Sequence, residues 1–381
     1  MRNTIVDNIR ALCMLGVIGI HTGSLALAPN DFTLYCLLEI LSRYSVPAFF
    51  FISGYGLCCT DKNLLSGGAL PYADFMKKRL RGAGLPYLSW SLLYMLYFWL
   101  ILPPGFVNWQ PLHVAFVLFF GLGCYHLYFM VILLWFYASY PLWRVLLRGI
   151  VKHGAAAGLA LLLLFQLAFN WWTTHPGVDP SQWSPLVKNF FVYRLNYLPL
   201  HYLLIFMGGA LAAVYWDKFL AWLRAYPLPV LALYLASVVY DAGSAYYAFR
   251  YQGYTLIDLA NTYHQLSPQG LLYTIASLLC FCLTLDLLER RVQSGSAPKA
   301  AVYLQRIIEL LAANSMLIYF IHPLLLDWLT SFYNKFGIVM TVKKVCLSYV
   351  LLVAGSLLAS LLLQEIFQRS KILSLLFTGK R

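Results

Sequence analysis

The sequence predicts an all-α fold, a polytopic membrane bundle of about ten transmembrane helices, because it is strongly apolar and its apolar runs are long. Hydrophobic residues make up 61% of the 381 residues and charged residues only 11%, whereas a soluble domain is about one-quarter charged. The runs are continuous, which favours helices over the alternating pattern of a membrane β-barrel. We therefore expect residues 1–381 to form a single integral-membrane domain in a lipid bilayer.

Each predicted span is an apolar run of about 20 residues, long enough for a helix to cross a bilayer. The run at 112–122 is shorter and is expected to be interfacial or re-entrant. If it crossed, the number of spans would rise by one and the topology downstream would reverse. The predicted spans are 5–28, 34–59, 83–102, 125–146, 155–173, 197–216, 226–248, 268–288, 309–332 and 343–367.

Basic residues predict the orientation. With the N-terminus in the cytoplasm, the cytoplasmic segments hold about three times as many Lys and Arg residues as the outer segments, in agreement with the positive-inside rule. The N and C termini are then both cytoplasmic. Topology accounts for the net charge of +13, so nucleic acid is not expected as a partner.

The first span contains three ionisable residues, Asp7, Arg10 and His21, and such residues are costly inside a membrane unless they serve a function. Arg10 and His21 are about three helical turns apart, so they share one face with about 16 Å between them along the axis. Asp7 and Arg10 have a structural alternative, as a helix cap and a cation that snorkels to the headgroups. His21 lies deeper, which favours a chemical or ligand-contacting role in the outer half of the span.

A second polar feature lies in the second span, between Arg43 and Leu57. Arg43 is a cation inside or at the edge of the membrane, and Pro47 interrupts the helical hydrogen-bond ladder. Ser53 and Gly54 allow another backbone to approach closely. The segment fits either a kinked packing helix or a polar notch facing His21.

A dense basic segment, which we expect to be a cytoplasmic loop, precedes the third span: Lys77, Lys78, Arg79 and Arg81 follow Asp74 within a few residues. The positive-inside rule alone would explain part of this charge. A polyphosphorylated ligand is the functional alternative, because Lys and Arg bind phosphate by charge-assisted hydrogen bonds.

Two further histidines inside spans are candidates, His126 at the start of the fourth span and His322 in the ninth. A histidine in a span can also be a hydrogen-bonded packing residue, and both alternatives stay open. The chain has no H-x-x-x-H or H-E-x-x-H pattern, and its cysteines lack the spacing of zinc ligands, so no metal is expected.

Five motifs in chain order resemble the membrane-embedded acyltransferase 3 family. Tyr128 stands where the family's His-Leu-Trp-Phe motif has Trp, and Arg81 stands one place early for the family's Arg-x-x-Arg pattern, so the resemblance supports Arg79 more strongly than Arg81. The motifs are Asp7-x-x-Arg10 followed by His21, Arg43-x-x-x-Pro47 running to Ser53-Gly54, Phe75-x-Lys-Lys-Arg before Leu85-Pro86-Tyr87, His126-Leu-Tyr-Phe, and Tyr319-Phe-Ile-His322-Pro.

The resemblance implies an O-acyltransferase that moves an acyl group, usually acetyl, from cytoplasmic acyl-CoA to a hydroxyl of an extracytoplasmic acceptor such as a cell-envelope glycan. It implies that His21 is the catalytic base and that Arg10 and Arg43 are the family's paired arginines. Acyl-CoA would be a donor substrate, and no cofactor would be bound permanently.

The residues themselves fit this chemistry. Histidine is suited to remove a proton near neutral pH. The donor phosphates would contact Lys78, Arg79 and Arg81, with Arg10 further in, while Ser53 or His126 would stabilise the oxyanion. A covalent acyl-enzyme is the alternative mechanism.

A multipass transporter or flippase, of a lipid-linked glycan or a small metabolite, also fits about ten spans with buried charges. A membrane sensor or scaffold would not need those charges. The expected location, through the family, is the cytoplasmic (inner) membrane of a bacterium.

Overall fold

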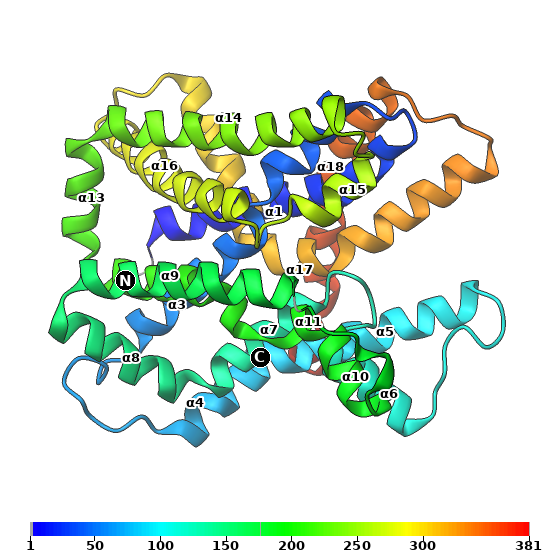
Figure 1. Ribbon diagram of the computed structural model, residues 1–381, viewed down its shortest axis with the longest axis horizontal. Coiled ribbons are helices and arrows are strands. Elements are labelled where there is room, and N and C mark those ends of the chain that lie inside the picture. Colours follow the sequence, from blue (N-terminus) through cyan, green and yellow to red (C-terminus); the bar gives the residue numbers. More distant parts are fainter. Residues whose placement is uncertain (1–2, 176, 381) are drawn as a thin grey trace. The chain divides into compact units, whose positions relative to one another are not determined.

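The computed structural model describes residues 3–175 and 177–380. Within these residues the regular elements are all helices (Figure 1), so the predicted all-α fold is confirmed. Eight helical segments are long and apolar enough to cross a membrane, or up to ten if each of two bent pairs is one span. This confirms the prediction of about ten spans. The cytoplasmic location of both termini stays a prediction.

The eight spans that are not bent pairs follow the predicted apolar runs, but the third and ninth spans begin about ten residues earlier, because polar, helix-forming residues extend the helices beyond the apolar run. Three spans contain a 3-10 or π-helical turn next to their α-helices. The spans are Thr4–Leu27 (α1, Thr4–Gly23; η1, Ser24–Leu27), Phe32–Thr60 (α2, Phe32–Leu38; η2, Ile40–Ser42; α3, Ser45–Thr60), Tyr72–Ile101 (α4, Tyr72–Arg79; η3, Leu80–Gly84; α5, Leu85–Ile101), Ala155–Thr174 (α9), Pro227–Tyr251 (α14), Pro268–Gln293 (α16), Lys299–Lys335 (α17) and Val342–Gln368 (α18).

Two further spans are bent. Helices α7 (Tyr128–Ala138) and α8 (Tyr140–His153) meet at 67°, and the segment Pro199–Val214 (η5, Pro199–Tyr202; α12, Leu203–Val214) meets α13 (Trp216–Ala225) at 98°. Pro141, in the first turn of α8, accounts for the first bend. A helix that continued from α7 through this residue would lose a backbone hydrogen bond, and the proline ring would clash with the preceding turn. Apolarity alone does not reveal such breaks.

The basic segment before the third span is helical, which corrects the expectation of a loop. Helix α4 continues into α5 through a π-helical turn, Leu80–Gly84. Pro86 explains the turn: its ring would clash with the carbonyl of Gly82 in a regular α-helix, and the wider π turn relieves that clash.

The remaining helices are short. Helix α6 has ten residues, which extend about 15 Å and are too few for a straight crossing. This agrees with the expectation for 112–122, whose place in the membrane stays a prediction. The short helices are α6 (Pro111–Phe120), η4 (Pro180–Gln182), α10 (Pro185–Val192), α11 (Arg194–Tyr197), α15 (Leu256–Thr262) and α19 (Lys371–Thr378).

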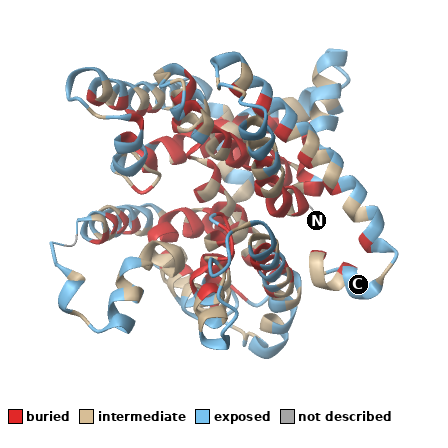
Figure 2. Ribbon diagram, turned by 90° about the vertical axis from the view of Figure 1, so that its right-hand side faces the viewer, coloured by how far each residue is buried: buried red, intermediate tan, exposed pale blue. Residues whose placement is uncertain are grey.

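The chain folds into two compact units. Unit 1 contains the residues up to Leu57 together with Gly208–Leu362, and unit 2 contains Cys58–Met207 together with the residues from Leu363 onward. In each unit the buried residues gather on helix faces that turn toward neighbouring helices, as Figure 2 shows in red. That residues 1–381 act as one domain stays a prediction.

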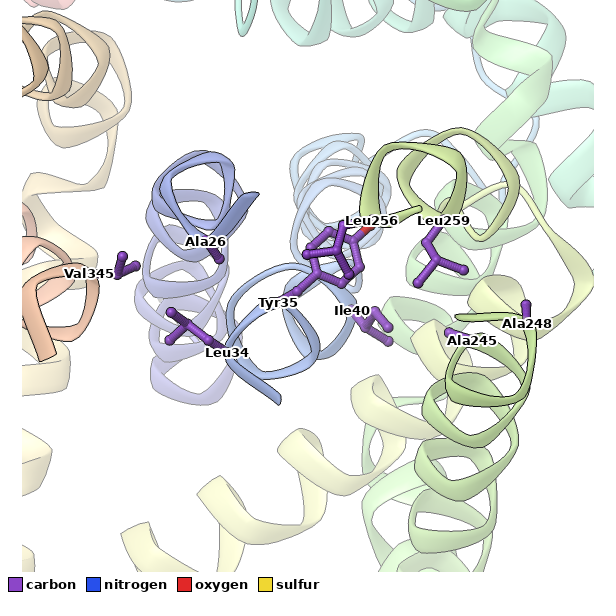
Figure 3. Close-up of a cluster of buried hydrophobic side chains, with 9 residues drawn as sticks. All are labelled: Ala26, Leu34, Tyr35, Ile40, Ala245, Ala248, Leu256, Leu259 and Val345. Carbon is purple, nitrogen blue, oxygen red and sulfur yellow. The ribbon is translucent and has the colours of Figure 1, made fainter. Parts of the chain in front are cut away.

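In unit 1, α1 packs along α17, and α14 and α16 lie side by side (Figure 1). A cluster of buried apolar side chains joins α2 to the short helix α15 and to α14 (Figure 3). Its members are Ala26, Leu34, Tyr35, Ile40, Ala245, Ala248, Leu256, Leu259 and Val345.

Candidate functional site

The start of α1 holds the first two candidate residues. The Asn3 side chain caps the helix by accepting a hydrogen bond from the Val6 N–H. One turn on, Arg10 Nη1 lies 2.5 Å from Asp7 Oδ1, and Asp7 is buried whereas the Arg10 side chain is 39% exposed. Asp7 is therefore the counter-ion of Arg10, and the guanidinium still reaches the surface of unit 1.

At the other end of α1, His21 meets His322. Their rings stack with centroids 5.2 Å apart and planes inclined by 27°. His322 is fully buried on α17, while His21 is partly exposed. The two histidines, about 300 positions apart in the sequence, thus form one site.

A backbone contact orients the His322 ring. Its Nδ1 lies 3.1 Å from the Ile318 carbonyl oxygen. A carbonyl oxygen only accepts, so Nδ1 carries a proton, and in the neutral ring Nε2 carries the lone pair. His322 therefore presents an acceptor nitrogen and fixes its own ring against the helix.

Glycines on another face of α1 let the second span approach closely. A Cβ at Gly16 would lie 2.8 Å from Ser45 Cβ, and a Cβ at Gly19 would lie 2.5 Å from Ser42 Oγ. Real Cβ atoms do not come so near, so only glycine fits this seam. The seam holds the second span against α1 and so helps to fix the rotation of the helix that carries His21.

Two tyrosine hydroxyls support α1 further. Tyr44 Oη donates to the Leu12 carbonyl oxygen at 2.9 Å, and Tyr349 Oη donates to the Leu15 carbonyl oxygen at 3.2 Å. These bonds come from the second and last spans, so α1 is held from two sides.

Arg43 is 2% exposed and lies in a buried polar cluster of unit 1. Its Nη2 donates to Tyr35 Oη at 3.1 Å and lies 3.5 Å from the Leu259 carbonyl oxygen of α15. Its charge acts on two carboxylates, Glu39 and Asp241. Arg43 therefore links α2 to α15 and supplies positive charge to two acids.

Asp241, on α14, has no exposed surface, and neither of its carboxylate oxygens has a hydrogen-bond partner among the described residues. The Nη1 atom of Arg43 is also buried and has no hydrogen-bond partner among the described residues. Buried groups of this kind are costly, and the attraction between the Arg43 charge and Asp241 offsets part of that cost. Neither Glu39 nor Asp241 was predicted from sequence, although both are ionisable residues within apolar runs.

Ser53 lies on α3 in unit 1, and its hydroxyl donates to the Phe49 carbonyl oxygen of its own helix at 2.9 Å. This bond satisfies the hydroxyl within the helix. Its role at an oxyanion stays a prediction.

Unit 2 holds the remaining candidates. Arg79 Nη2 donates to Thr60 Oγ1 at 3.2 Å, and the guanidinium lies over the rings of Phe75 and Tyr137 at 5.3 and 5.4 Å. Lys77 and Lys78 are exposed, whereas Arg79 and Arg81 are partly buried. These contacts hold the long Arg79 side chain in place.

His126 is 2% exposed and packs edge-on against Tyr94, with ring centroids 5.5 Å apart. Tyr125 contacts the same ring at 5.8 Å. The aromatic enclosure is typical of a packing residue, so a part for His126 in catalysis stays a prediction.

The comparison with protein families decides the class of the molecule. The family model described as an acyltransferase domain (Acyl_transf_3) matches residues 3–365. The chain belongs to the acyltransferase 3 family. No curated protein and no solved structure matches it.

As a member of the acyltransferase 3 family with eight to ten helices that can cross a membrane, the protein is a multipass membrane acyltransferase. Among the described residues, no group of His, Cys, Asp and Glu could hold a metal ion. Within unit 1 of this acyltransferase, the structure pairs His21 with His322 and Arg10 with Asp7. The basic segment and His126 belong to unit 2.

Proposed function

We propose that the protein is an O-acyltransferase that moves an acetyl group from cytoplasmic acetyl-CoA to a hydroxyl of an extracytoplasmic carbohydrate. The observation that carries the proposal is the stacked pair of His21 and His322, in a chain whose family transfers acyl groups. On the predicted topology, the pair lies in the outer half of the first span, where an acceptor from outside would arrive. The membrane would be the cytoplasmic membrane of a bacterium.

In the proposed reaction, His21 acts as the general base. A ring nitrogen takes the proton of the acceptor hydroxyl as its oxygen bonds to the thioester carbonyl carbon. Collapse of the tetrahedral intermediate breaks the C–S bond, and the departing CoA thiolate takes the proton back from the imidazolium. Proton and charge balance, and His21 returns to its neutral form.

His322 is a positioning residue in this scheme. Its Nδ1–H is held by the Ile318 carbonyl, so its ring is fixed, and stacking on that ring limits the orientations open to His21. Holding a catalytic group in one orientation lowers the barrier to reaction.

The basic segment of unit 2 supports a separate part of the proposal, which is binding of the CoA phosphates. Lys78 is exposed for a point-charge contact, and Arg79 is aligned by Thr60 and by two aromatic rings. A guanidinium held in this way loses little freedom when it binds phosphate. Arg81 is the third proposed contact.

The test uses the purified full-length protein in lipid nanodiscs with radiolabelled acetyl-CoA and a panel of cell-envelope glycans. We expect release of free CoA thiol that requires both protein and acceptor, together with label on the acceptor. A transporter or flippase would leave the thioester intact, and absence of thioester cleavage with every acceptor would contradict the proposal.

A further inference from the structure

The C-terminal helix α19 (Lys371–Thr378) lies beyond residues 3–365, which the family model matches. In unit 2 it packs against η3 and α5, the π-helical turn and the third span. The helix thus rests on the basic segment that ends in Arg81, and it follows the residues that the family model matches.

Specific contacts fix this docking. Trp90 Nε1 donates to the Phe377 carbonyl oxygen at 3.3 Å, and the two rings meet edge-on with centroids 5.6 Å apart. Phe377 also stacks on Phe367 at 5.0 Å. Ser374 and Thr378 are buried on the docked face.

The end of the helix touches the backbone of the π turn. Gly379 ends α19 with φ +68°, a left-handed conformation that favours glycine. A Cβ there would lie 2.7 Å from the Arg81 carbonyl oxygen and 2.7 Å from Gly82 Cα. The chain thus needs glycine at position 379 both for its backbone conformation and for this close approach.

The docking places one more cation beside a basic segment. Lys380 is exposed and follows Gly379 directly, and Gly379 contacts the backbone of Arg81, so Lys380 lies beside the end of the basic segment. Arg79 and Arg81 each have a buried Nε without a hydrogen-bond partner among the described residues. Like charges brought together repel, and a nearby anion relieves such repulsion.

We propose that α19 completes an anion site for phosphate groups, by holding the π turn in place and by adding Lys380 to Arg79 and Arg81. The inference rests on the proposed donor-binding role of the basic segment. Two sources could supply the phosphate, namely coenzyme A and the headgroup of an anionic lipid, and both present the same chemistry to these cations.

Two matched pairs of variants test the site. Lys380→Ala and Lys371→Ala remove the same charge from opposite ends of the α19 segment, about 13 Å apart. Gly379→Ala and Gly295→Ala impose the same backbone strain, because their φ angles are +68° and +70°, but a Cβ at Gly295 meets nothing within 4 Å. The second member of each pair is the control.

In one arm, coenzyme A is titrated by calorimetry into full-length protein in phosphatidylcholine nanodiscs. In the other, retention of phosphatidylglycerol is measured by native mass spectrometry. We expect Lys380→Ala to weaken binding about threefold to tenfold at low salt, with a smaller effect at high salt, and Gly379→Ala to weaken it about tenfold. Both controls should bind as the wild type does.

The two arms distinguish coenzyme A from an anionic lipid as the source of the phosphate. Loss confined to the coenzyme A arm assigns the site to the donor, and loss confined to the lipid arm assigns it to headgroups. Equal binding by all four variants in both arms would overturn the inference even if the wild type binds coenzyme A. If the wild type does not bind coenzyme A, the donor-binding part of the proposed function fails, whereas the lipid arm still tests α19.

Discussion

His21 and His322 stack on each other, with ring centroids 5.2 Å apart, although they belong to the first and ninth spans. Packing of α1 along α17 creates this pair. The Ile318 carbonyl fixes the protonated nitrogen of His322. One histidine is therefore rigid and buried and the other is partly exposed, which is a suitable arrangement for a base and the group that positions it.

The positioning role predicts that the ring nitrogens of His322 are needed even when an aromatic ring is kept at this position. His322→Phe keeps an aromatic ring but loses the bond to Ile318, and we expect turnover to fall about tenfold to hundredfold, because small misplacements of a catalytic group cost that much. KM for the acceptor should change less than kcat. Steady-state kinetics of acetyl transfer measure both, and a variant with wild-type kcat would contradict the role.

The glycine seam predicts that α1 tolerates no side chain at position 19. In Gly19→Ala the new Cβ would meet Ser42 Oγ at 2.5 Å and the Leu38 carbonyl oxygen at 3.0 Å. We expect a loss of about 1–3 kcal/mol in the free energy of unfolding. The control is Gly56→Ala on α3, where a Cβ meets nothing within 4 Å and alanine should stabilise the helix by about 0.5–1 kcal/mol. Thermal unfolding in detergent compares the two, and equal stability of both variants would refute the seam.

The buried cluster predicts that Arg43 and Asp241 are energetically coupled. Arg43→Met leaves Glu39 and Asp241 without the cation that acts on them. It should therefore lower the free energy of unfolding more than Asp241→Asn does. Adding Asp241→Asn should restore part of the loss, with a coupling of about 1–3 kcal/mol in the double-mutant cycle. If the two substitutions simply add, the residues are independent and Arg43 serves α15 alone.

The Asp258 carboxyl group of α15, a short helix outside the spans, predicts that the stability of this helix depends on pH. The Thr255 hydroxyl and backbone N–H both donate to Asp258 Oδ2, at 2.7 and 2.9 Å, and lower the pKa of this carboxyl group below its ordinary value. A lowered pKa in the folded state stabilises the fold above the ordinary value, about 3.9, and that stabilisation is lost as the pH falls through the lowered value.

Hydrogen exchange measures this effect directly. At neutral pH, Asp258→Asn should reduce the protection of α15 amides relative to the wild type, and the difference should shrink as the pH falls below the ordinary pKa of an aspartate, about 3.9. Because Leu259 of α15 accepts from Arg43, the variant should also loosen that contact. Equal protection of both proteins at neutral pH would contradict the prediction.

Much of the fold follows from sequence because the length of an apolar run is a direct physical requirement of the bilayer. The runs predict ten spans, in agreement with the structure. The bend before Pro141 and the start of the third span at Tyr72 are not predicted, because hydropathy does not register a broken helix or a polar helical extension.

The site is only partly predictable. The cost of burying charge singles out Asp7, Arg10, His21 and Arg43. The same rule, applied to Asp241, would have identified a further residue. The stacking of His21 on His322 and the close approach at Gly19 depend on long-range packing. No spacing along one segment encodes them, so the histidines could only be predicted as separate candidates.

The most direct test of His21 as the general base is the rate of acetyl transfer by His21→Ala in membranes. The control is His153→Ala, because His153 is an exposed histidine at the end of α8. If His21 is the general base, its loss should lower kcat about 100- to 10,000-fold, while acetyl-CoA binding and the control variant stay at wild-type values. Undiminished transfer by His21→Ala would contradict the central claim.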